Sequence, residues 1–114
     1  MALSAFRTRY LHQKPHADVS GLQQLRQCLA DMRADIERER SGLRDRYDKV
    51  ADDAAFTQQL LDEHGSLSLS SKVRRLTCAM IGHTERIAML QAQIDFVVDL
   101  QQRADAFLES RPVA

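Results

Sequence analysis

Residues 73–108, VRRLTCAMIGHTERIAMLQAQIDFVVDLQQRADAFL, decide the fold of this chain. Eleven positions in this stretch recur at alternating steps of three and four, and nine of them are apolar. These positions are Val73, Leu76, Met80, His83, Ile87, Leu90, Ile94, Val97, Gln101, Ala104 and Leu108. Such spacing places side chains on one face of an α-helix. The stretch predicts a long amphipathic helix over about 71–110, which ends because Arg111 precedes Pro112.

A second apolar pattern predicts a helix over about 20–64. Ser20 and Gln23 fit a capping box at its start, and Gly65 is typical of the residue that follows a helix. The apolar heptad positions are Leu22, Leu25, Leu29, Met32, Ile36, Leu43 and Val50, but three later d positions are polar: Glu39, Arg46 and Asp53. Residues 65–70 are expected to form the turn.

Two long helices joined by a short turn pack as antiparallel neighbours. The sequence therefore predicts an all-α fold, a long antiparallel two-helix coiled-coil hairpin over 18–114. The register that matches the apolar positions sets Leu43 against Leu90 and Leu25 against Leu108. An alternative is a break at Ser41-Gly42 that would give a three-helix bundle, because a glycine inside a helix costs about 1 kcal/mol relative to alanine.

The stretch CAMIGHTERI, residues 78–87, contains a cysteine, a histidine and a glutamate within eight positions. Cys78 and His83 are five residues apart, which separates them by about 140° around a helix axis. Glu85 follows His83 by two residues and points almost the opposite way. The three side chains cannot hold one metal ion, and we expect no metal, cofactor or catalytic site in the chain. His83 falls at a core position, where Asp53 is expected to be its hydrogen-bond partner in a polar core layer.

Acidic and basic residues balance at sixteen each, so the chain has no net field that would attract nucleic acid. The first 17 residues include Arg7, Arg9 and Lys14 but no acidic residue, and we expect them to form a basic arm or a short helix. An organelle transit peptide is an alternative for this segment. No apolar run is long enough to span a membrane. The sequence indicates a cytoplasmic protein with no membrane partner, and nucleic-acid binding through the basic arm remains a minor alternative.

The second helix carries more apolar residues than one partner helix can cover. A second stripe contains Met89, Phe96, Leu100 and Phe107, and Ile81 and Val98 lie on the other flank. Contiguous apolar patches usually mark interfaces. We expect these six residues to bind a partner or to pair two hairpins into a homodimeric four-helix bundle. The N-terminal segment could also fold back over part of the stripe through Leu3, Phe6, Tyr10 and Leu11.

These features favour a protein that is not an enzyme: a protein-protein interaction module such as an adaptor, a small chaperone or an inhibitor. A structural subunit of a larger helical assembly, such as a secretion apparatus, is the alternative.

Overall fold

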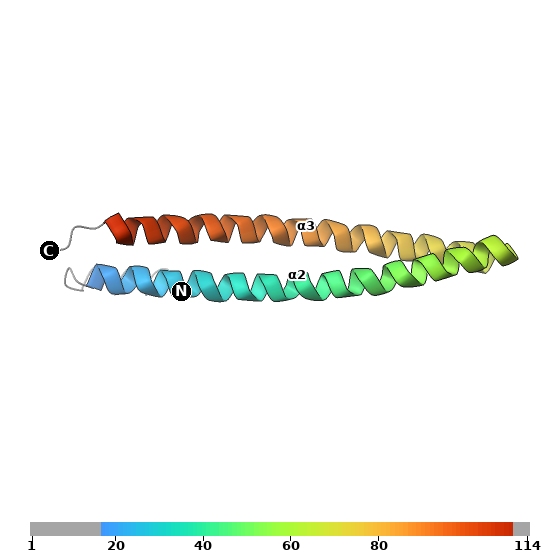
Figure 1. Cartoon of the computed structure of the whole chain (residues 1–114), viewed down its shortest axis with the longest axis horizontal. Helices are drawn as coiled ribbons and strands as arrows, with labels where there is room; N and C mark the ends of the chain where they lie inside the picture. Colours follow the sequence, from blue (N-terminus) through green and yellow to red (C-terminus); the bar gives the residue numbers. More distant parts are fainter. Residues whose placement is uncertain (1–16, 111–114) are drawn as a thin grey trace, which may run out of the picture. The chain divides into compact units, whose positions relative to one another are not determined.

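The chain is described here by a computed structural model that covers residues 17–110 and the side chains of 19–110. Two helices account for this part of the chain: α2, Ala17–His64, and α3, Leu67–Ser110. Figure 1 labels both helices, and its colours follow the sequence from the blue start of α2 to the red end of α3. No strand occurs in residues 17–110, and the predicted all-α helical hairpin is confirmed.

The turn between the helices is shorter than the predicted turn over 65–70. Gly65 has a φ of 62° and donates its backbone N–H to the Leu61 carbonyl at 2.8 Å, which closes the end of α2. The Ser66 hydroxyl oxygen then accepts hydrogen bonds from the backbone N–H groups of Ser68, at 3.1 Å, and Leu69, at 3.4 Å. Ser66 is therefore the N-cap of α3, and this helix begins three residues before Ser70.

The start of α2 also differs from the prediction. The helix begins at Ala17, so Ser20 lies inside it and does not act as the N-cap. The predicted alternative of a break at Gly42 is wrong, because α2 continues through this position without interruption. A methyl group added at Gly42 would meet nothing within 4 Å, so neither close packing nor a positive φ requires a glycine at this position.

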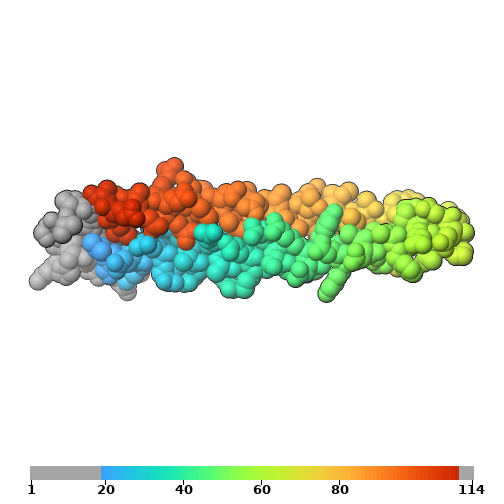
Figure 2. Space-filling model, in the orientation of Figure 1, coloured from blue at the N-terminus to red at the C-terminus, as the bar shows by residue number. Residues whose placement is uncertain are grey.

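The chain divides into two compact units. The turn unit is Asp35–Ile94, and the terminal unit contains the described residues 17–34 and 95–110. In the turn unit, Leu43 and Leu90 are both buried, as the predicted register requires. Arg40, three residues before Leu43, donates a hydrogen bond to the Gln91 side chain, one residue after Leu90. Figure 2 shows α2 and α3 packed directly against each other within this unit.

The terminal unit repeats this arrangement. Leu29 of α2 and Ala104 of α3 are buried. Arg26, three residues before Leu29, forms an ion pair of 2.7 Å with Asp105, one residue after Ala104. The same offsets therefore define the alignment of the two helices within each unit.

Candidate protein-binding surface

The α3 side chains that the sequence assigned to an interface are mostly accessible to solvent. Ile81, Met89, Phe96 and Phe107 are each more than half exposed. Leu100 is half-buried, as is Val98. The first four positions therefore leave large apolar surfaces in contact with water, and a partner could cover them.

The structure adds exposed apolar side chains that the sequence did not assign to this surface. Leu25 and Met32 of α2 were predicted to lie in the core, but they are 44% and 50% exposed. Gln101, which the register places opposite Met32, accepts a hydrogen bond of 3.2 Å from Arg33. This polar contact crosses between the helices at the level of Met32, and the methionine lies half-exposed at the edge of the seam. A polar residue opposite an expected core position was the available signal in the sequence.

Two further exposed apolar residues lie in the turn unit. Phe56 of α2 is 61% exposed, and Leu67, the first residue of α3, is 89% exposed. Thr57, the residue that follows Phe56, is buried. The Thr57 hydroxyl donates a hydrogen bond of 2.7 Å to the Asp53 backbone carbonyl, so this buried polar group is satisfied within its own helix.

Five apolar residues of the terminal unit form what we call the terminal apolar face: Leu25, Met32, Phe96, Leu100 and Phe107. The heptad positions of these residues place them on one side of the seam, with contributions from both helices. Cys28, which is exposed, lies on the same side of α2 because it follows Leu25 by three residues and precedes Met32 by four. On this side of α2, the terminal apolar face therefore continues from Leu25 through Cys28 to Met32 without a charged residue between them.

The opposite side of the terminal unit is polar. A groove of about 450 Å³ runs there, lined mainly by glutamine, arginine and aspartate side chains. The Arg26–Asp105 ion pair and the Arg33–Gln101 hydrogen bond cross between the helices at this groove. Val98 is the most apolar residue of the groove lining. Because it lies on this side of the terminal unit, Val98 does not extend the terminal apolar face.

A smaller groove of about 260 Å³ lies in the turn unit. Its lining includes Tyr47 of α2 and Met80 and Ile81 of α3. Ile81 is therefore exposed toward a shallow apolar depression, and Met89 is exposed elsewhere on α3. Both residues belong to the turn unit, whereas Phe96, Leu100 and Phe107 belong to the terminal unit.

The predicted polar layer of His83 and Asp53 has a different arrangement in the turn unit. The Asp53 carboxylate forms an ion pair of 3.4 Å with Lys72 and lies 3.5 Å from the Thr57 hydroxyl. Glu39, two heptads earlier, pairs in the same way with Arg86 at 3.0 Å. These acidic residues thus turn from the seam toward basic residues on the flank of α3. Asp53 binds Lys72 rather than His83, which is half-buried, and the predicted pair does not form.

The CAMIGHTERI segment belongs to α3, where Cys78 and Glu85 are exposed and His83 is half-buried. In residues 17–110 no group of three His, Cys, Asp or Glu side chains could hold a metal ion. Cys28 and Cys78 are both free and exposed. The basic arm, with Arg7, Arg9 and Lys14, lies outside the described residues.

Comparisons of the chain with models of protein families, with curated proteins and with solved structures gave no match. Among the described residues, neither helix has a segment long and apolar enough to cross a membrane.

Proposed function

We propose that the chain is a non-catalytic protein-protein interaction module that binds its partners through the exposed apolar side chains of its helices. One observation carries the proposal: Ile81, Met89, Phe96 and Phe107 of α3 are each more than half exposed on a chain of 114 residues. Large apolar side chains in water cost free energy that a partner surface recovers by covering them.

The proposal includes self-association. Two hairpins that bury these side chains against each other would form a homodimeric four-helix bundle, an arrangement in which each hairpin contributes two helices. An adaptor, a small chaperone or an inhibitor would use the same side chains to bind a helix of another protein. We place this activity in the cytoplasm and assign it no cofactor.

The first test compares the wild-type chain with Phe96→Glu. Tagged wild-type and variant chains are purified from the native host, and each is then analysed by multi-angle light scattering. We expect Phe96→Glu to lose a specific partner or the self-associated species, because a charge at the centre of the apolar surface must be buried when a partner binds. The matched control is Phe56→Glu, which changes a 61% exposed phenylalanine of α2 that lies outside the α3 stripe.

A Phe96→Glu chain that keeps the same partners, the same mass and the same stability as the wild type would contradict the proposal. An equal loss in Phe96→Glu and in Phe56→Glu would show that α3 has no special role in binding.

A further inference from the structure

The terminal apolar face has the size expected for the apolar part of a stable interface. Its most exposed members are Leu25 at 44%, Met32 at 50%, Phe96 at 64% and Phe107 at 56%. With roughly 200 Å² for a large side chain, these fractions correspond to about 430 Å² of exposed apolar surface. Stable interfaces bury about 800 Å² on each partner, of which about 55–65% is apolar. The face thus supplies most of the apolar area that one side of such an interface needs.

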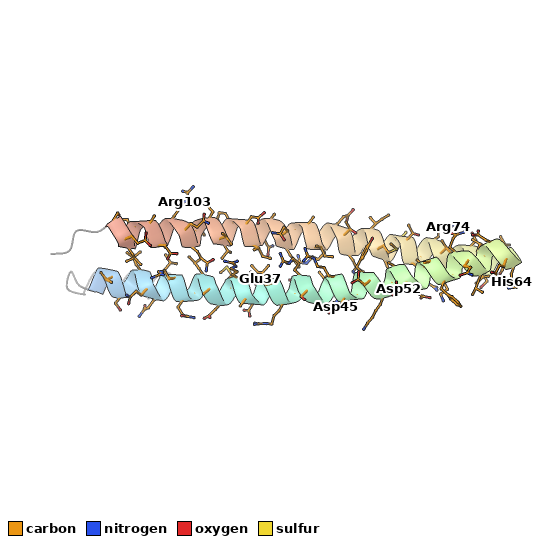
Figure 3. All side chains as sticks on the ribbon, viewed as in Figure 1. Glu37, Asp45, Asp52, His64, Arg74 and Arg103 are labelled. Atoms are coloured by element: carbon orange, nitrogen blue, oxygen red, sulfur yellow. The ribbon has the colours of Figure 1, made fainter. Side chains whose placement is uncertain are left out.

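Two opposite charges border this face, one on each helix. Asp31 of α2 follows Cys28 by three residues, and Arg103 of α3 lies three residues after Leu100 and four before Phe107. Figure 3 shows Arg103 projecting away from α2. Within the chain, Asp31 accepts a hydrogen bond of 2.9 Å from Gln27. Arg103 pairs with Asp99 of its own helix at 3.0 Å and is 76% exposed, so both charges remain accessible to a partner.

Asp31 and Arg103 also lie at nearly the same height along the terminal unit. Leu29 and Ala104 are buried at one level, which the adjacent Arg26–Asp105 pair confirms. Asp31 lies two residues beyond Leu29 and Arg103 one residue before Ala104, so their heights differ by one residue, or about 1.5 Å.

We propose that the terminal apolar face binds the same face of a second copy of the chain, around a twofold axis parallel to the helices, so that α2 of each copy lies on α3 of the other. This arrangement keeps equal heights together. It brings Asp31 of each copy against Arg103 of the other, which forms two equivalent ion pairs in one dimer. By the same offsets, Leu25 meets Phe107 and Met32 meets Leu100. The inference rests on the proposed function and specifies its self-associating partner and orientation.

The test uses charge reversal in the full chain. In Asp31→Arg, each dimer would contain two contacts between arginines, and in Arg103→Asp it would contain two contacts between aspartates. We expect each variant alone to raise the dimer dissociation constant about 10- to 100-fold, because like charges at an interface oppose association. An equimolar mixture restores opposite charges at both contacts, and the expected product is a heterodimer with close to wild-type affinity. Analytical ultracentrifugation with one fluorescently labelled variant measures the dissociation constant of each variant alone and that of the heterodimer in the mixture.

The single reversals, compared with the wild type, separate this arrangement from one in which α2 lies on α2. If α2 lay on α2 of the second copy with Asp31 against Asp31 and Arg103 against Arg103, the wild-type dimer would already contain like charges, and neither single reversal would weaken it. Single variants that dimerise as tightly as the wild type, or absence of a heterodimer in the mixture, therefore overturn the proposed orientation, even if Phe96→Glu dissociates the wild-type dimer and the proposed function stands. A wild-type chain that stays at 13.0 kDa over the whole concentration range overturns the second copy as occupant, whether residues 1–16 or another protein then covers the face. If Phe96→Glu changes neither the partners, the mass nor the stability of the chain, the proposed function is overturned as well.

Discussion

Replacing Leu90 with alanine tests whether the seam of the turn unit holds the hairpin together. Leu90 is 1% exposed and belongs to the same layer as Leu43, which is 7% exposed. The substitution removes three carbon groups, worth about 0.8 kcal/mol each when buried. The resulting cavity raises the expected cost further, although a layer of only two helices can partly collapse around it. We expect Leu90→Ala to lower the free energy of unfolding by about 2.5–3.5 kcal/mol.

Leu67→Ala is the matched control, because it makes the same chemical change at a residue that is 89% exposed. Its effect should stay within about 0.5 kcal/mol, as is usual for surface substitutions. Urea unfolding followed by circular dichroism at 222 nm gives both values, at one protein concentration so that any self-association contributes equally. A Leu90→Ala chain that unfolds within about 1 kcal/mol of Leu67→Ala would refute the assigned register, since a buried leucine and an exposed one would then be equivalent.

Three further substitutions or labelling experiments test other features. Gly65→Ala should destabilise the chain by about 1 kcal/mol, because an L-residue is strained at a φ of 62°. Gly82→Ala, inside α3 with open space around it, should instead stabilise the chain by about 0.5–1 kcal/mol. Thermal unfolding of the two variants checks these opposite signs. Ser66→Ala should cost about 1 kcal/mol by removing the N-cap of α3, and a Ser66→Asp variant that keeps full stability would show that a capping oxygen is what matters. Cys28 should react with a maleimide more slowly than Cys78 when the chain is dimeric and at a similar rate after dilution, with mass spectrometry locating the label; equal rates at every concentration would argue against a covered terminal apolar face.

The fold could be predicted from the sequence because its main determinant is periodic. Steps of three and four along residues 73–108 require a long helix, and the matching pattern on the first helix leaves few ways to align the two. The helix ends were less predictable, since the sequence has several serines between residues 66 and 71 and each of them could cap the second helix. Gly65 ends α2, and the Ser66 hydroxyl that follows directly accepts the first free N–H groups of α3, from Ser68 and Leu69.

The site was only partly predictable, for a related reason. The α3 stripe was visible as apolar residues beyond the seam, and exposure of Met89, Phe96 and Phe107 agrees with that reading. The contribution of α2 was not visible, because Leu25 and Met32 occupy heptad positions that usually lie in the core. Their exposure depends on which side of the seam the polar residues cross, and a heptad pattern does not contain this information.

Cross-helix polar contacts therefore help to determine which side of the terminal unit can associate. The Arg26–Asp105 ion pair and the Arg33–Gln101 hydrogen bond lie on the side of the polar groove. A partner that covered this groove would remove water from both contacts and from the surrounding glutamines, and burying charged and amide groups costs free energy unless every one of them gains a new partner. Covering the terminal apolar face has a smaller cost of this kind, because Asp31 and Arg103 at its border carry opposite charges and can pair across the proposed twofold interface. The proposed association through the apolar side thus rests on the position of the polar contacts as much as on the apolar residues themselves.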